Sequence, residues 1–227
     1  MADPAPHPVD ADQEIVDRFH ELYYSDHKRT VGNTFWRGVQ VSKCPLDLWI
    51  YQEILHERRP DVVVETGTFF GGSAYFMASL FDLLGSGRVI TIDVKKRRPE
   101  RLPQHPRIDY RVGSSVDPEV VAGVRASIDD GERVMVVLDS NHHYPHVRAE
   151  LDAYAPIVSE GDYLIVEDTN VNGHPITPHF GPGPMEAVDD FLAECEEFEI
   201  DRPREKFYLT FNPRGYLRRT RPAQTGA

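Results

Sequence analysis

Two spacings of hydrophobic residues divide the chain: a helical spacing near the start and short β-branched runs from Asp61 onward. Between residues 12 and 24, apolar side chains recur every three or four positions, which predicts an amphipathic helix ahead of the core domain. The stripe consists of Ile15, Val16, Phe19, Leu22 and Tyr23. A stripe of this kind can pack on its own domain or on another subunit, so the sequence leaves its partner open.

The stretch CPLDLWIYQEIL predicts a second helix that begins at Pro45. Proline suits the first helical position, and Asp47 suits the positive end of the helix dipole. We expect the buried face to consist of Leu46, Trp49, Ile50 and Ile54.

Short apolar runs then alternate with helical stretches. The runs are VVVET, RVITID, IDYRVG, RVMVVLDS and DYLIVED. Helices are predicted between them at 73–84, 118–128 and 146–158, and after them at 184–195. This alternation predicts an α/β fold with a parallel sheet and right-handed crossovers. The final runs, FEIDR and KFYLTFNPRGYLRR, can pair as an antiparallel edge.

Length and composition favour one globular domain with extensions. The 227 residues are 40% hydrophobic and 27% charged, as in an ordinary folded chain. We divide the chain into an arm with N-terminal helices at 1–58, a core domain at 59–219 and a tail at 220–227. Residues 1–11 contain three prolines, and both ends are expected to be loose and to carry no chemistry.

Charge and cysteine content exclude several classes of protein. The formal net charge is −12, and no basic stripe offsets it, so a nucleic acid partner is not expected. Cys44 and Cys195 are too few for a disulfide framework, which suits a reducing cytoplasm. The chain has neither a signal-like N-terminus nor 18 consecutive apolar residues, so we expect no membrane span.

The predicted strands end in polar residues, and ligands of parallel α/β sheets bind beyond those ends. The first strand enters the bend GTFFGG, which lacks the G-x-G-x-x-G pattern that a dinucleotide needs, so NAD is disfavoured. Glu65 can accept hydrogen bonds from an amino group, and Asp93 can accept two from ribose hydroxyls. An adenosine ligand without a pyrophosphate points to S-adenosylmethionine.

Three further carboxylates end the fourth and fifth strands: Asp139, Glu167 and Asp168. Neighbouring strands lie about 4.8 Å apart, so these groups would converge and repel one another unless a cation joined them. Oxygen ligands suit Mg²⁺ or Ca²⁺. Glu167 and Asp168 can both reach one metal only if the strand has already ended, because adjacent strand residues point to opposite faces.

Histidines follow Asp139 in the stretch DSNHHYPHV. Histidine suits a general base near neutral pH, and we favour His142, although the sequence does not rank it firmly above His143. The long polar run at 169–184 suits a loop that covers a substrate.

Four stretches, KCPLDLWIYQEIL, VVETGTFFGGSA, LDSNHHYPHV and YLIVEDTNVNGHP, together resemble the cephalosporin hydroxylase/rhamnosyl O-methyltransferase family. The similarity extends from about Trp36 to Arg218. It implies a Rossmann-like class I methyltransferase fold, whose mostly parallel seven-stranded sheet ends in an antiparallel strand. It also implies S-adenosylmethionine and Mg²⁺ as cofactors, a sugar or antibiotic hydroxyl as acceptor, a role in natural-product biosynthesis, and oligomers formed through N-terminal helices.

By the same resemblance, individual positions acquire roles. Those that match the donor site are Glu65, Gly67, Ser73, Asp93 and, near the adenine, Ser114. Those that match the magnesium ligands are Asp139, Glu167 and Asp168. We expect the metal to activate the acceptor hydroxyl, His142 to remove its proton, and the methyl group to transfer in line. The alternatives are an NAD-dependent oxidoreductase and a non-catalytic partner of another enzyme.

Overall fold

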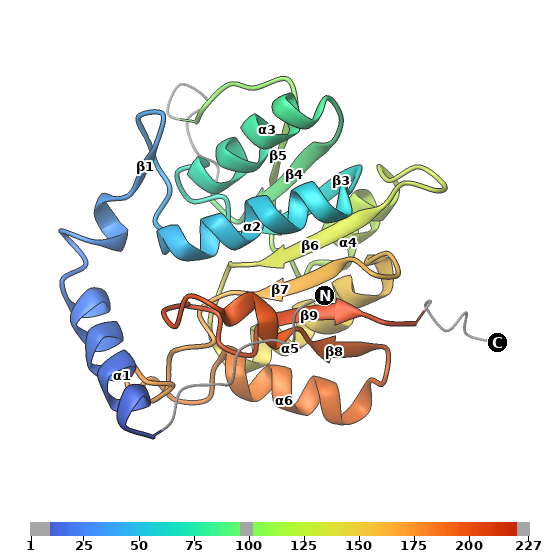
Figure 1. Cartoon of the computed structure of the whole chain (residues 1–227). Helices are drawn as coiled ribbons and strands as arrows, with labels where there is room; N and C mark the ends of the chain where they lie inside the picture. The colour runs from blue at the N-terminus through green and yellow to red at the C-terminus, as the bar shows by residue number, and fades with distance from the viewer. Residues whose placement is uncertain (1–9, 96–101, 222–227) are drawn as a thin grey trace.

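The computed structural model describes residues 10–95 and 102–221, and its centre is one twisted sheet between two layers of helices (Figure 1). Residues 1–9 of the predicted arm and 222–227 of the predicted tail lie outside the described residues. Among the described residues, no helix is both long and apolar enough to cross a membrane.

Within the described residues the main sheet has seven strands in the order β5-β4-β3-β6-β7-β9-β8. Their bounds are β3 Val62–Thr66, β4 Arg88–Asp93, β5 Ile108–Val112, β6 Val134–Leu138, β7 Tyr163–Val166, β8 Phe198–Ile200 and β9 Tyr216–Arg219. Strands β3 to β7 pair in parallel, whereas β9 is antiparallel to both β7 and β8. The predicted mostly parallel sheet with an antiparallel last strand is confirmed.

Helices cover both faces of the sheet. They are α2 Pro45–Arg58 and α3 Gly72–Leu84 on one face, and α4 Pro118–Arg125, α5 Tyr144–Tyr154 and α6 Pro184–Glu194 on the other. Alternate strand residues feed the two cores: Val62 and Val64 pack with the second group of helices, and Val63 packs with the first. Each fully buried side chain of this kind stabilises the fold by about 1.5–3 kcal/mol.

The strand order reverses between β3 and β6: the chain adds β4 and β5 on one side of β3, and then β6 and β7 on its other side. Such a switch point leaves a crevice outside the carboxyl ends of the strands. The polar strand ends singled out in the sequence therefore lie at this edge of the sheet.

Helix α1 Asp10–Ser25 lies apart from the sheet, in blue at the left of Figure 1. A 3₁₀ turn, Val31–Asn33, and a hairpin of β1 Phe35–Trp36 with β2 Val39–Gln40 connect it to α2. The helix was predicted, but its apolar stripe is largely uncovered in this chain: Ile15, Phe19 and Leu22 are 68%, 51% and 64% exposed. The docked side instead presents His20 and Tyr24, whose rings pack against Phe211.

Helix α2 starts at Pro45 as predicted, but its buried face differs from the prediction. Trp49 is 57% exposed, so its predicted burial is wrong, whereas Asp47 is buried. The Asp47 carboxylate accepts hydrogen bonds from Thr210 Oγ1, the Phe211 amide and the Tyr216 hydroxyl. Burial, and then the charge of Glu167, raise the pKa of Asp47 to about 7. This buried acceptor ties the start of α2 to the segment that leads into β9.

Candidate functional site

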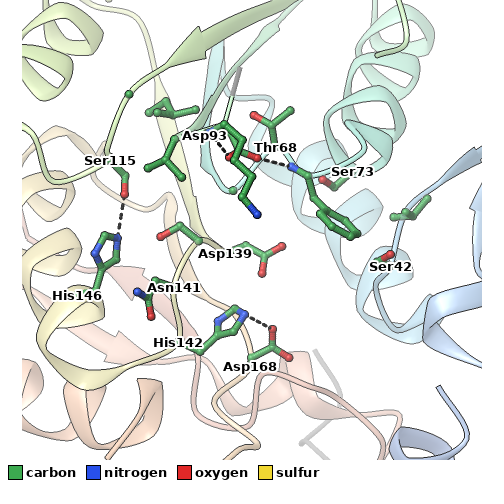
Figure 2. Close-up of a pocket in the computed structure, with 18 residues that line it drawn as sticks. Ser42, Thr68, Ser73, Asp93, Ser115, Asp139, Asn141, His142, His146 and Asp168 are labelled. Carbon is green, nitrogen blue, oxygen red and sulfur yellow. Dashed lines mark hydrogen bonds and ion pairs between the residues drawn. The ribbon is translucent and has the colours of Figure 1, made fainter. Parts of the chain in front are cut away.

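A cavity of about 410 Å³ opens at the carboxyl ends of β3, β4 and β6 (Figure 2). Residues from several chain segments meet in its wall. They include Gly67 and Ser73 around the bend, Asp93 at the end of β4, Ser115 after β5, and Asp139 and His142 after β6. The volume falls in the range of small-molecule sites.

The bend after β3 depends on glycine at position 67. Gly67 has φ +89°, and a Cβ added there would lie 1.8 Å from the carbonyl oxygen of Asp139. The close approach of the bend to the end of β6 therefore leaves no room for any other residue. This contact holds the floor of the cavity against the strand end that carries Asp139.

Asp93, predicted to bind ribose, lines the cavity and also fixes its wall. Its Oδ2 accepts a hydrogen bond of 3.0 Å from the amide of Phe69 in the bend, and its Oδ1 accepts one of 2.8 Å from the amide of Lys95. The ribose role of Asp93 stays a prediction.

Glu65 is fully buried beneath the bend. Thr91 Oγ1 donates a hydrogen bond of 2.7 Å to its Oε2, but Oε1 has no hydrogen-bond partner in the described part of the chain. Burial raises the pKa of Glu65 to about 7, against the opposing charge of Lys43. An unpaired buried acceptor is costly, so Glu65 Oε1 is suited to a donor group that arrives with a ligand.

The predicted donor residues divide between the wall and its surroundings. Gly67, Ser73 and Asp93 line the cavity, and Glu65 lies behind it. Ser114 is not among the lining residues, whereas its neighbour Ser115 is, with its hydroxyl 3.1 Å from His146 Nε2. The adenine role proposed for Ser114 therefore stays a prediction without a contact to support it.

An acidic cluster lies at one end of this cavity. Asp139 follows β6 directly and Asp168 follows the neighbouring strand β7, so the two carboxylates converge as the strand pairing requires. Ligand atoms of Asp139, His142 and Asp168 all lie within 4.8 Å of one another, a separation at which one cation can bridge them. His142 Nε2 is 3.2 Å from Asp168 Oδ2. Figure 2 marks this contact with a dashed line.

Glu167 is adjacent to Asp168 but faces a different group. Its Oε1 lies 2.7 Å from the ammonium of Lys43 and accepts a hydrogen bond from the Tyr51 hydroxyl. The strand has ended at Val166, and Asp168 adopts φ +55°, so the alternation of strand side chains does not apply to these two carboxylates. Glu167 therefore remains a predicted metal ligand, and its observed partners are Lys43 and Tyr51.

The two candidate bases occupy different surroundings. His142 is half-buried beside Asp168, whereas His143 is exposed and its ring stacks on Phe180. Burial lowers the pKa of His142, but Asp168, Asp139 and Glu167 together raise it further, so the pKa lies above its usual value. The geometry favours His142 over His143 as the residue that meets a substrate.

A second, smaller cavity of about 110 Å³ lies on the other side of the cluster. Asp139, Glu167 and Asp168 all line it, together with Tyr24 from α1 and Phe211. Burial and then the charge of Asp168 raise the pKa of Tyr24, as expected for a hydroxyl close to the carboxylates. The cluster thus separates a large cavity from a small one that α1 helps to enclose.

Comparison with known proteins decides the family. The family model described as rhamnosyl O-methyltransferase/CmcI matches residues 28–220. The chain belongs to this family. It is 37% identical over 208 residues to the rhamnosyl O-methyltransferase of Mycobacterium tuberculosis, covering 89% of this chain and 84% of the relative. It is 35% identical over 207 residues to that of Mycobacterium leprae, covering 89% and 90%.

Solved structures agree on the fold. CmcI with Mg and SAM aligns with a TM-score of 0.63 at 23% identity, over 83% of this chain and 77% of that one. The O-methyltransferase TomG of Streptomyces achromogenes, solved with SAM, aligns with a TM-score of 0.55 at 16% identity, over 91% and 90%. The predicted family, the class I methyltransferase fold and the assignment as an O-methyltransferase are confirmed, and the oxidoreductase alternative falls away.

Sequence reasoning missed several residues of this O-methyltransferase. Lys43 and Tyr51 carry no spacing signal, because one lysine before a helix and one tyrosine on it are usually solvated or core residues. Both lie in KCPLDLWIYQEIL, one of the stretches that resemble the family, and that stretch was the available signal. Tyr24 was missed because the end of α1 reaches the site only through the tertiary fold.

Proposed function

We propose that the protein transfers the methyl group of S-adenosylmethionine to a hydroxyl of a sugar or a related natural product, with a bound Mg²⁺. The observation that carries the proposal is the common wall of the cavity and the acidic cluster: Asp139, His142 and Asp168 belong to both. A donor in the cavity would thus lie beside the groups that activate the acceptor. The name of the mycobacterial relatives supports a sugar acceptor.

The donor side of the proposal rests on the carboxylates around the bend. Glu65 Oε1, buried and without a hydrogen-bond partner among the described residues, suits an amino group. Asp93 lines the cavity at the end of β4, where a ribose binds in this fold. Gly67 and Ser73 would complete the pocket around the methionine part of the donor.

The metal side rests on the chemistry of the cluster. Asp139, Glu167 and Asp168 supply oxygens, which suit Mg²⁺, and all three line the smaller cavity. A Mg²⁺ held there would lower the pKa of an acceptor hydroxyl and fix its position. Tyr24 and Phe211 provide aromatic surface for the acceptor in the smaller cavity.

His142 would remove the acceptor proton. Asp168 would orient its ring through Nε2 at 3.2 Å. His142 lines the larger cavity beside Asp139 and Asp168, which line both cavities, so it lies next to the boundary where donor and acceptor would meet. The deprotonated oxygen can then attack the methyl carbon as the carbon–sulfur bond breaks, which releases S-adenosylhomocysteine. Much of the rate gain would come from orientation of the two substrates.

The test is methyl transfer from labelled S-adenosylmethionine to rhamnose-bearing glycosides, with Mg²⁺ and with a chelator. We expect Mg²⁺-dependent labelling of the sugar, and its loss in Asp139→Asn. The matched control is Asp109→Asn, since Asp109 is exposed on the edge strand β5 and pairs with Arg111 on the same strand. Asp139→Asn with full Mg²⁺-dependent turnover would refute the metal role, and donor binding without transfer to any acceptor would favour a non-catalytic partner.

Two further properties belong to the same proposal. The exposed apolar stripe on α1 supports a homo-oligomer that buries Ile15, Phe19 and Leu22. The unpaired Cys44 and Cys195 support a reducing compartment, and we propose the cytoplasm.

A further inference from the structure

Lys43 is a buried cation at the centre of the acidic cluster. Its ammonium nitrogen lies 2.7 Å from Asp139 Oδ2 and 2.7 Å from Glu167 Oε1, and its side chain is only 3% exposed. Its two partners come from the ends of different strands, β6 and β7, whereas Lys43 itself lies two residues before the start of α2. One side chain therefore joins the N-terminal segment to both strand ends of the candidate site.

The charges around Lys43 do not balance without it. Asp139, Glu167 and Asp168 lie together, and no described residue other than Lys43 contributes a lysine or arginine cation to them. Moving such charges out of water is costly, and removing one partner of a buried pair is strongly destabilising. Lys43 is therefore the cation that the contacts place between Asp139 and Glu167.

The contacts of Lys43 leave part of each carboxylate available. It bonds Oδ2 of Asp139 and Oε1 of Glu167, and Tyr51 uses the same Oε1. The hydrogen bonds of Lys43 go to these oxygens and not to the second oxygen of each group, Asp139 Oδ1 and Glu167 Oε2. A divalent cation can thus approach the cluster while Lys43 still holds both carboxylates by their other oxygens.

We propose that Lys43 is the built-in counter-ion and positioning residue of the acidic cluster, which assembles Asp139 and Glu167 before a metal binds and sets the affinity for that metal. The part that concerns the metal rests on the proposed function. The positive charge of Lys43 partly neutralises the carboxylates, so it weakens their attraction for a divalent cation. The same charge keeps the carboxylates together when no metal is bound, so the site stays folded without metal.

The first test needs no metal and no activity. Thermal midpoints would be measured in chelator for the wild type, Lys43→Met, Glu167→Gln and the double variant. Lys43→Met leaves the carboxylates without their cation and should lower the thermal midpoint. The double variant also lacks the negative charge of Glu167, so its midpoint should lie above that of Lys43→Met. A double variant no more stable than Lys43→Met, or one that fails to fold, would overturn the proposal.

The second test measures Mg²⁺ itself by calorimetric titration. Lys43→Met should bind Mg²⁺ about tenfold more tightly than the wild type, a usual size for coupling between two sites, and Mg²⁺ should raise its thermal midpoint more. Lys43→Arg keeps the charge and should stay near the wild type. Lys206→Met is the matched control, because Lys206 pairs with Glu53 on the surface. Unchanged or weaker Mg²⁺ binding by Lys43→Met would overturn the proposal.

The two tests separate this proposal from the function on which it rests. If no variant binds Mg²⁺ but the metal-free cycle shows the expected coupling, the metal role fails and the counter-ion role of Lys43 stands. If Mg²⁺ binds and methyl transfer proceeds but the cycle is additive, the counter-ion role fails and the function stands.

Discussion

At the scale of single residues, the chemistry of the site depends on which polar atoms already have partners. Glu65 Oε1 has none among the described residues, while Glu167 Oε1 has two. His142 faces Asp168 at the cavity, and His143 faces outward onto Phe180. The two adjacent histidines therefore differ in which groups they can act on, and substitution of each one separately tests which of them takes part in the reaction.

Replacement of His142 by glutamine should lower kcat by a factor of about 10² to 10⁴, the usual contribution of a general base. His142 lines the larger cavity, so donor binding is measured as well, and the proposed role predicts a larger loss in kcat than in donor affinity. His143→Gln is the matched control and should keep a near wild-type kcat. Steady-state rates with labelled donor measure both, and equal losses in the two variants would remove His142 from its role.

Residues of the site could be predicted from the sequence where they stand at the end of a predicted strand. Asp93, Asp139 and Asp168 follow apolar runs, and parallel pairing then brings such ends to one edge. Lys43 and Asp47 were not predictable as buried charges, because burial of a charge depends on partners far along the chain. Asp47, for example, depends on Thr210 and Tyr216.

At the scale of elements, the bend between β3 and α3 determines the position of the cavity floor. Gly67→Ala would drive a Cβ into the carbonyl oxygen of Asp139, so we expect a loss of folding free energy well above the cost of backbone strain. Gly85→Ala is the matched control: Gly85 has φ +85°, but no described atom lies within 4 Å of its added Cβ. That control should lose only about 1–2 kcal/mol. Urea denaturation measures both, and equal losses would contradict the close approach.

The docking of α1 should depend on pH through His20. Burial, opposed by Asp17, lowers the pKa of His20 from 6.5 to about 4, and its Nε2 pairs with the Asn170 side chain. Between pH 6.5 and 4 the unfolded chain binds a proton that the folded chain does not, so stability falls as the pH falls through this window. Above pH 6.5 this contribution is constant.

We expect this histidine to remove about 2–3 kcal/mol of folding free energy at pH 4.5 relative to pH 7.5. His20→Gln should reduce the difference by that amount, because glutamine does not titrate. Denaturant unfolding at the two pH values measures it. Equal pH dependence in the wild type and His20→Gln would show that His20 is protonated in the folded state.

Element positions followed closely from periodicity, but the buried faces did not always do so. The helices at Pro45 and Pro118 begin as predicted, because proline and an acidic first turn mark their starts. Trp49 was assigned to the core from its hydrophobicity and proved exposed. The buried face of α2 instead contains Asp47 and Tyr51, which form hydrogen bonds with distant parts of the chain. Local pattern indicates a helix, while the tertiary network selects its buried face.

At the scale of the whole molecule, the catalytic fold and α1 together enclose the site. Phe211 precedes β9 in a segment tied to α2, and it also packs on the inner side of α1. The outer side of α1 presents Ile15, Phe19 and Leu22. These three side chains recur at helical spacing and lie exposed on one face of α1.

We expect this outer side to be the contact between subunits. Ile15→Ser with Leu22→Ser should shift the protein toward the monomer in light scattering coupled to size exclusion, while the fold persists. Leu83→Ser is the matched control, because Leu83 is 84% exposed on α3 and lies outside the stripe. A wild type that is monomeric at all concentrations would contradict the expectation.

The central claim, that the cavity at the end of β3 and β4 holds a methyl donor beside a metal cluster, is tested most directly by calorimetric titration with S-adenosylhomocysteine. The account predicts saturable binding of one ligand per chain, weakened at least tenfold by Glu65→Gln and by Asp93→Asn, a loss of about 1.4 kcal/mol each. The control Asp109→Asn should bind as the wild type does. Absence of binding, or binding that both site variants retain in full, would contradict the account.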